Sequence, residues 1–367
     1  MTPKVYFTDF CTGTSETLPQ KLARLIMSAG IDQIDFQNKF VAIKIHFGEL
    51  GNMAHLRSGY ARVLVDIIKD LGGKPFLTDA NTLYRGSRKN ALDHIETAYL
   101  NGFTPYSTGA HVIIADGLKG TDEVAVPVKD GVYVKDALIG RAIMDADIVI
   151  SLNHFKGHEE AGFGGALKNL GMGSGSRAGK KDMHDDCRPV VDRDACVACG
   201  ACADICAHGA PNLVDGKMFV DWNKCYGCGR CLDVCPVKAI AANNHDAALY
   251  LNYKIAEYAK AVVDGRPHFH ISLVRDVSPY CDCHAENDIP IVPDVGMFAS
   301  FDPVALDLAC ADAVNAQPVM PGSKLAKAAP ADLDNLTRDF PHTSWRAQIE
   351  HAKKIGLGED SYELVTI

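Results

Sequence analysis

The sequence carries one string of four cysteines twice, as Cys196-Val-Ala-Cys199-Gly-Ala-Cys202-Ala-Asp-Ile-Cys206 and as Cys225-Tyr-Gly-Cys228-Gly-Arg-Cys231-Leu-Asp-Val-Cys235. The cysteine spacing is identical, and a glycine and an aspartate recur in frame. The two strings are therefore an internal duplication. They hold most of the 13 cysteines of the 367-residue chain, which makes them the strongest signal in the sequence.

This spacing is typical of iron–sulfur chemistry. Three cysteines separated by two residues each can wrap around one cubane, and a fourth, slightly further on, ligates the neighbouring cubane. We therefore predict two 4Fe–4S clusters, the first held by Cys196, Cys199, Cys202 and Cys235 and the second by Cys225, Cys228, Cys231 and Cys206. Structural zinc is the alternative, but zinc sites usually offer two separated pairs of ligands.

Residues 190–241 resemble a bacterial two-cluster ferredoxin. Between the strings, residues 209–221 predict a hairpin with Asp215-Gly216 as its turn, which fits the paired strands of a ferredoxin. One departure is that Ala207 follows Cys206, where the family usually has proline, whereas Pro236 follows the second string. The extra amide N–H near one cluster predicts that the two clusters differ in potential.

The flanking sequence alternates short apolar runs with amphipathic stretches, which is typical of an α/β domain. Strands are expected at residues 5–7, 40–45, 75–78, 111–115, 147–152, 268–274 and 289–292. Helices are expected at residues 15–29, 57–71, 87–101, 247–263 and 302–313. The predicted fold is one α/β domain with a mainly parallel sheet flanked by helices, interrupted by a small α+β ferredoxin-like insert. Residues 1–186 and 242–367 form the α/β domain, residues 187–241 form the insert, and residues 171–180 are a flexible entry to it.

Polar residues follow two of the predicted strands, where α/β proteins place ligand groups. Lys44-Ile-His46-Phe-Gly48-Glu49 ends one strand, with Lys44 and His46 on the same face, although a solvated strand end explains it equally well. The string Asn153-His154-Phe-Lys156-Gly-His158-Glu159-Glu160 follows another strand. Its histidines, lysine and carboxylates predict a patch for proton transfer or metal binding.

A glycine-rich stretch, Gly162-Phe-Gly-Gly-Ala-Leu-Lys168-Asn169, comes next. Backbone amides at glycines can approach an anion, and Lys168 can supply the counter-charge, although close helix–sheet packing explains the glycines equally well. The candidate catalytic residues are His46, Glu49, His154, Lys156, His158 and Lys168.

The pair Cys281-Asp-Cys283, followed by His284, is a candidate for a further metal or for redox chemistry. Against this, one intervening residue is tight for chelating a single ion, and neutral buried thiols are common. Cys11, Cys187 and Cys310 are expected to be ordinary free thiols.

Together these strings resemble the domain of unknown function 362 family, which often carries a ferredoxin. The matching stretches are 44–49, Pro75-Phe-Leu-Thr-Asp79-Ala-Asn-Thr-Leu-Tyr84, 155–158, 162–169, 281–283 and Ala299-Ser-Phe-Asp302-Pro-Val-Ala-Leu-Asp307. The resemblance implies one domain interrupted by a ferredoxin. It also implies that His46, His158, Lys168 and Cys283 are site residues, but it implies no particular reaction.

The predicted function is that of an iron–sulfur redox protein passing single electrons through two clusters to a site in the α/β domain. This would be a reductase-type oxidoreductase acting on a small molecule. The alternative is a non-catalytic electron-transfer or metallocentre-maturation protein that binds a further metal near Cys281 and Cys283. A third reading makes the clusters structural.

Composition and charge limit the classes of binding partner and the cellular setting that the sequence predicts. The net charge of −9 disfavours nucleic acid and anionic membranes, and no apolar run approaches the roughly 18 residues of a membrane span. The N-terminus has no visible export signal, and oxygen damages exposed cubanes. We therefore expect an anaerobic cytoplasm and a low-potential electron donor such as a ferredoxin or flavodoxin.

Overall fold

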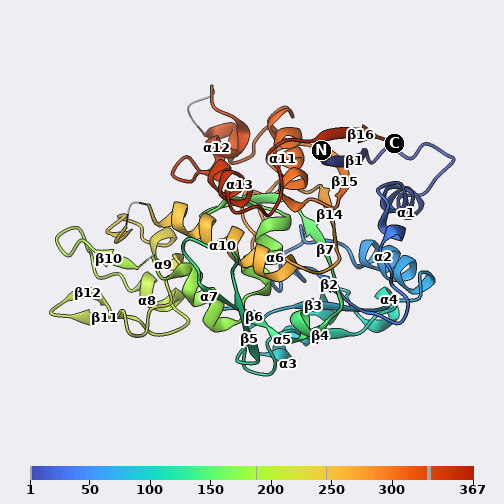
Figure 1. Cartoon of the computed structure of the whole chain (residues 1–367). Coiled ribbons are helices and arrows are strands. Elements are labelled where there is room, and N and C mark those ends of the chain that lie inside the picture. The colour runs from blue at the N-terminus through green and yellow to red at the C-terminus, as the bar shows by residue number, and fades with distance from the viewer. Residues whose placement is uncertain (1, 187, 245, 329–331) are drawn as a thin grey trace.

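The computed structural model describes residues 2–186, 188–244, 246–328 and 332–367 (Figure 1). Its centre is an eight-stranded sheet in the order β16-β1-β15-β14-β7-β2-β3-β4. These strands are β1 (Lys4–Thr8), β2 (Phe40–Lys44), β3 (Lys74–Asp79), β4 (Val112–Ile114), β7 (Ile148–His154), β14 (His268–Val274), β15 (Gly296–Ser300) and β16 (Glu363–Thr366). β15 runs antiparallel to both of its neighbours, and every other pair in this sheet is parallel. The predicted α/β class with a mainly parallel sheet is confirmed.

Helices cover both faces of the sheet, as expected for parallel strands whose two faces are both apolar. One face packs against α1 (Leu18–Ser28), α2 (Ser58–Asp70) and α3 (Ala91–Leu100). The other packs against α6 (Ala166–Ser174), α10 (Ala247–Val263), α11 (Pro303–Asn315) and α13 (Trp345–Lys354). Figure 1 shows α1 and α2 on the opposite side of β7 and β14 from α6 and α10.

Capping residues explain where two helices start later than predicted. Thr17 caps α1 in a reciprocal arrangement with Gln20, so this helix begins at Leu18. Asn90 accepts bonds from the first turn of α3, whereas Ser87, the predicted start, bonds the Glu49 carboxylate instead. A polar side chain with a tertiary partner is no longer free to cap a helix.

Two local predictions are wrong. Residues 289–292 contain no strand; Ile291 and Val292 are buried in a bend, and their apolar character reflects that burial. Residues 171–180 are not a flexible entry, because α6 runs to Ser174 and α7 (Arg177–His184) follows at once, capped by Ser176. Gly171 is needed because a Cβ there would collide with the backbone carbonyl of Ile255 in α10. Gly171 therefore serves close helix packing rather than chain mobility.

Residues 189–242 pair among themselves. β10 (Pro189–Val191) pairs with β13 (Ile240–Ala242), and β11 (Pro211–Val214) pairs with β12 (Lys217–Val220). The short helices α8 (Ala201–Ile205) and α9 (Arg230–Asp233) lie between them. The β11–β12 hairpin turns at Asp215 and Gly216, both with positive φ, as predicted. Figure 1 shows this segment projecting to the left of the sheet.

The proposed limits of the insert, at 187 and 241, stay predictions, and Cys187 lies outside the described residues.

The remaining elements are the hairpins β5 (Glu123–Pro127) with β6 (Asp136–Gly140) and β8 (Lys156–His158) with β9 (Gly162–Gly164), the helices α4 (Pro105–Thr108), α5 (Arg141–Asp145) and α12 (Asn335–Asp339), and the 3-10 turns Ile31–Gln33 and Leu325–Lys327. Among the described residues, no helix is both long enough and apolar enough to cross a membrane.

Candidate functional site

A cavity of about 100 Å³ opens where β2, β3 and β7 end and where the segment after β14 returns. Residues predicted from four separate strings line it, namely His46, His154, Lys156, His158, Lys168, Cys281 and Cys283. The carboxyl ends of neighbouring parallel strands meet at one edge of a sheet, which explains the convergence. We call this cavity the central pocket.

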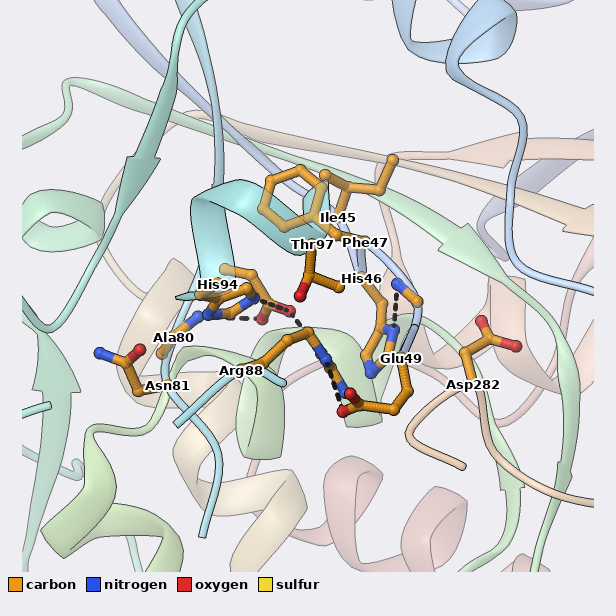
Figure 2. A network of polar contacts seen from close by, with 12 residues as sticks. Ile45, His46, Phe47, Glu49, Ala80, Asn81, Arg88, His94, Thr97 and Asp282 are labelled. Atoms are coloured by element: carbon orange, nitrogen blue, oxygen red, sulfur yellow. Dashed lines mark hydrogen bonds and ion pairs between the residues drawn. The ribbon is translucent and has the colours of Figure 1, made fainter. Parts of the chain in front are cut away.

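Glu49 lies behind the wall of the central pocket and acts through Arg88. Its Oε2 lies 3.3 Å from Nε of Arg88, whose NH1 lies 3.3 Å from Oδ2 of Asp79. Figure 2 shows the Arg88 guanidinium reaching Glu49, with the His46 ring beside it. Although burial opposes ionisation, Arg88 and Ser87 keep the pKa of Glu49 below its usual value. Glu49 is therefore a buried counter-ion that positions Arg88 at the pocket.

Sequence reasoning missed Arg88 as a site residue. It lies in the loop between β3 and α3, beyond the polar strings that follow strands, and no local pattern distinguishes it from a surface arginine. Its side chain is 1% exposed. The two carboxylates that hold it come from other segments, so only the fold shows its burial.

Lys44 joins the segments beside the pocket through a network of polar contacts. Its Nζ lies 2.9 Å from Oδ1 of Asp79 and donates to Oδ1 of Asn169 at 2.7 Å. Asn169 in turn donates to the Lys44 carbonyl and to Oδ1 of Asn153. This network joins β2, β3, β7 and α6. Lys44, the last residue of β2, is thus a structural neighbour of the site.

His46 and His158 both present a neutral ring to the pocket. Nδ1 of His46 accepts from the Gly48 N–H at 3.1 Å, and Nδ1 of His158 accepts from the N–H groups of Glu160 and Ala161 at 3.1 Å each. The proton of each neutral ring therefore sits on Nε2. Burial lowers the pKa of His46 well below its usual value and also lowers the pKa of His158. Each neutral ring can donate a hydrogen bond through Nε2–H.

His154 has both ring nitrogens engaged. Nδ1 lies 2.9 Å from each carboxylate oxygen of Asp282, and Nε2 lies 2.7 Å from the carbonyl of Arg275. Lys156 adds an ion pair to Asp282 at 3.3 Å. In this arrangement His154 and Lys156 hold Asp282, the residue between Cys281 and Cys283. Both line the pocket, and their proposed catalytic role stays a prediction.

Cys281 and Cys283 form a hydrogen-bonded pair in the pocket wall. This bond, together with burial, raises the pKa of Cys281 to about 11, while the same bond lowers the pKa of Cys283. Lys168 Nζ lies 3.8 Å from the Cys281 sulfur, and His158 also hydrogen-bonds this thiol. Although burial opposes its charge, the two sulfurs raise the pKa of Lys168.

Glu159 and His284 form a second polar group next to Cys283. Glu159 Oε1 lies 2.6 Å from Nε2 of His284, and one ligand atom from each of Glu159, Cys283 and His284 lies within 4.8 Å of the others. Arg230 of α9 contacts the His284 ring. The sequence suggested a site at Cys281 and Cys283, but the contribution of Glu159 needs the fold.

The first cysteine set surrounds its own cavity. A cavity of about 20 Å³ is lined by all four predicted ligands, Cys196, Cys199, Cys202 and Cys235, together with apolar residues that include Met218 and Ile240. Backbone N–H groups of Ala198 and Ala239 donate to the sulfurs of Cys196 and Cys235. Cys235 comes from the second string and lies with the first set, while the exchange of fourth ligands between two clusters stays a prediction. The residues fit a cysteine-ligated metal centre.

The second set gathers in the same way. Burial, with repulsion from neighbouring thiols that include Cys206, raises the pKa of Cys228 to about 11 and that of Cys231 to about 12. Backbone N–H groups donate to the sulfurs of Cys225 and Cys206 at 3.4 Å. Cys228 is also part of the wall of the central pocket. One cysteine thus belongs to both sites.

Contacts from the α/β body hold this segment in place. Arg85 donates to the carbonyl of Asp204 at 2.5 Å, and the His208 ring bonds the carbonyl of Leu83 at 2.6 Å. His208 also stacks on Tyr226, with ring centroids 4.0 Å apart. Since these residues flank the second cysteine set, they position it against the pocket.

Comparison with protein families places most of the chain in a family. The profile of the family described as Domain of unknown function (DUF362) matches residues 41–312, which is most of the chain. The chain belongs to the DUF362 family. In this DUF362 protein the matched region holds the central pocket and both cysteine strings. No curated protein matches the sequence.

Two solved structures have a distant likeness to this DUF362 protein. One is a crystal structure of a protein from Thermotoga maritima, 12% identical, with a TM-score of 0.41, covering 81% of this chain and 57% of that chain. Another is the lactate racemase apoprotein from Thermoanaerobacterium thermosaccharolyticum, 12% identical, with a TM-score of 0.34, covering 75% of this chain and 51% of that chain. The DUF362 chain spans little more than half the length of either.

Proposed function

We propose that the protein is an iron–sulfur oxidoreductase that delivers single electrons to a small molecule in the central pocket. The observation that carries the proposal is the position of Cys228, which belongs to the second cysteine set and also lines the pocket. Its neighbours in the wall are the polar residues predicted to handle substrate, so an electron leaving this set would arrive beside them.

The cysteine sets support two 4Fe–4S clusters as the resident groups. The eight ligands stand in the sequence pattern of paired cubanes, and the first set surrounds a cavity walled by apolar residues. When bound, such clusters supply one-electron transfer. The chain's own part is to hold them in series, with Cys228 at the end nearest the substrate.

The pocket residues support a reduction coupled to proton transfer. His46 and His158 keep Nδ1 bonded to backbone N–H groups, so His46 can donate Nε2–H to substrate while His158 donates to the Cys281 sulfur. The Lys168 ammonium beside this sulfur is the candidate source of the proton. Lys168 and Arg88 add positive charge, which favours an anionic or carbonyl-bearing substrate. Apolar side chains, among them Leu152 and Leu251, complete the wall and limit water.

The proposal is tested on protein purified without oxygen. Iron and sulfide analysis should give about eight of each per chain. The Cys228→Ser variant should lose about half of this iron, whereas Cys11→Ser, which alters an exposed thiol, should lose none. Protein reduced by dithionite is then mixed with a panel of small carboxylates, carbonyl compounds and disulfides, and the rate of reoxidation is measured. The proposal fails if Cys228→Ser keeps all its iron, or if the His158→Gln and Lys168→Met variants are reoxidised like the unaltered protein.

The electron donor and the setting belong to the same proposal. A one-electron donor of low potential, such as a ferredoxin or flavodoxin, would feed the first cysteine set. Val197 and Val237 line that set's cavity and are 59% and 43% exposed, so a partner protein can approach it. An anaerobic cytoplasm would suit the chemistry.

A protein without turnover of its own is the second candidate, either an electron carrier or a factor in metallocentre maturation. The grouping of Glu159, Cys283 and His284 favours it, because a cargo metal could rest there. Reoxidation kinetics separate the two candidates. A carrier would reduce an artificial acceptor at a rate that no member of the panel changes.

A further inference from the structure

We propose that Glu159, Cys283 and His284 form a mononuclear site for a borderline divalent cation of the zinc, iron(II), cobalt or nickel class. The cation's part in the reaction rests on the proposed function, whereas its binding depends only on side chains of this chain. The three ligand atoms lie within 4.8 Å of one another and face the central pocket.

The donor set decides the class of cation. A thiolate, an imidazole nitrogen and a carboxylate oxygen together suit borderline metals, whereas magnesium and calcium prefer oxygen alone. The two anionic ligands balance the charge of one divalent ion. Three protein ligands and a position open to a cavity are the arrangement of catalytic rather than structural sites.

The carboxylate of Glu159 supplies an independent sign of a missing ligand. Its Oε1 bonds Nε2 of His284 at 2.6 Å, but its Oε2 is buried with no hydrogen-bond partner. A buried carboxylate oxygen without a partner is costly, and a cation bound by Glu159 would relieve that cost.

The surroundings of His284 allow the exchange of a proton for a metal. Nδ1 lies 3.5 Å from Oε1 of Glu286, and Arg230 contacts the same ring. The Arg230 guanidinium contacts Nδ1 itself. Binding of the cation at Nε2 places the ring proton on Nδ1, so it requires Arg230 to release this nitrogen to the Glu286 carboxylate, which can accept the hydrogen bond. A carboxylate behind a ligating histidine is a common support for metal sites.

The position beside the second cysteine set suggests what the cation does. Cys228, Cys283 and His284 line one cavity, so a substrate that binds the open position through an oxygen or sulfur atom lies next to the electron source. The substrate class is thus a small molecule with a metal-binding carbonyl, carboxylate or thiol group. Lys168 and His158 lie around the same group of sulfurs.

The test measures zinc on cluster-loaded protein prepared without oxygen and dialysed against zinc buffered by a weak chelator. We expect about one zinc per chain, with affinity reduced more than about tenfold in Cys283→Ser and in His284→Gln. Glu286→Gln should weaken binding less, which keeps the test informative if the other variants fold poorly. Cys11→Ser, which alters an exposed thiol, is the matched control.

Iron and sulfide are measured on the same samples, so the two proposals can fail separately. Full clusters with zinc binding that all the variants retain would overturn the metal site and leave the oxidoreductase standing. Zinc lost specifically in the ligand variants, on a protein that never holds iron and sulfide, would uphold the metal site and overturn the oxidoreductase.

Discussion

Both carboxylate oxygens of Asp282 lie 2.9 Å from Nδ1 of His154, and neither side chain is more than 1% exposed. This pair joins the end of β7 to the segment that carries Cys281 and Cys283. The second ring nitrogen of His154 bonds the Arg275 carbonyl, and Lys156 forms an ion pair with the same Asp282 carboxylate. The structure thus holds a cysteine pair in place with a buried charge.

Replacing Asp282 by asparagine should therefore destabilise the protein. The change leaves His154 and Lys156 without their buried counter-charge, at a cost of about 3 kcal/mol in the free energy of unfolding. Thermal or urea unfolding of the anaerobic protein measures it. The exposed Asp288→Asn is the control and should change little. Equal stability of the two variants would contradict the buried charge pair.

Glu257→Gln should have a comparable effect far from the pocket. The Glu257 carboxylate accepts backbone N–H bonds from residues 132–134 and a bond from His351 at 2.8 Å. Although burial opposes ionisation, these bonds lower its pKa, so its contribution to stability is lost as pH falls through that lowered value. We expect a loss of about 2 kcal/mol near neutral pH, measured by urea unfolding. The exposed Glu350→Gln variant should unfold like the unaltered chain.

Gly171→Ala tests the close packing of α6 on α10. A Cβ at Gly171 would meet the carbonyl of Ile255, so the helices must separate, at about 1–3 kcal/mol. Gly59→Ala, within α2, has no atom within 4 Å of the added Cβ and should stabilise by up to about 1 kcal/mol. Unfolding midpoints of the two variants should move in opposite directions. A neutral Gly171→Ala would mean that the glycine is needed for something other than packing.

The stability that Asp307 contributes should fall as pH rises, whereas the stability from a carboxylate with a lowered pKa falls as pH drops. It accepts the N–H groups of Ala166 and Leu167 at the start of α6, but burial raises its pKa from 3.8 to about 7. The folded state therefore holds a proton that the unfolded chain has lost, and stability falls as pH rises from about 4 to about 7. The shift corresponds to a few kcal/mol, on the order of 4.

The Asp307→Asn variant isolates this contribution. Its stability relative to the unaltered protein should improve as pH rises between about 5.5 and 7.5, a window that spares acid-labile clusters. Thermal midpoints of both proteins across that range give the comparison. If the difference between them stays constant, Asp307 does not titrate there.

Ala207→Pro should lower the potential of one cluster. Proline removes the amide N–H that follows Cys206, and hydrogen bonds to cluster sulfur raise the potential. The backbone of Cys206, with φ −74° and ψ 122°, is one that a residue before proline adopts readily. Redox titration followed by electron paramagnetic resonance should show one of two signals moving to lower potential. If neither signal moves, the Ala207 amide does not affect the potential of a cluster.

Local spacing explains why much of the site was predictable. The paired strings of cysteines, and the polar residues just after strands, are patterns within short segments. Such residues stay close to one another in any fold of this class. Arg88 was not predicted because its partners come from two different strands. Glu49 follows β2, and Asp79 is the last residue of β3. Glu159 and His284 escaped as partners because they lie on segments far apart in the chain. The glycines of 162–173 were ambiguous because their close neighbours, such as Ile255 of α10 beside Gly171, lie far away along the sequence.

By itself, the sequence determined the α/β class and the two strings of cysteines, because periodicity and ligand spacing are properties of short segments. It also determined which polar strings would stand at strand ends. Only the tertiary structure decided that Cys228 shares a wall with His46, His158 and Lys168, and that Glu159 faces Cys283 and His284. The physical reason is that parallel crossovers bring strand ends together across long stretches of chain, and the packing of those connections sets which side chains meet.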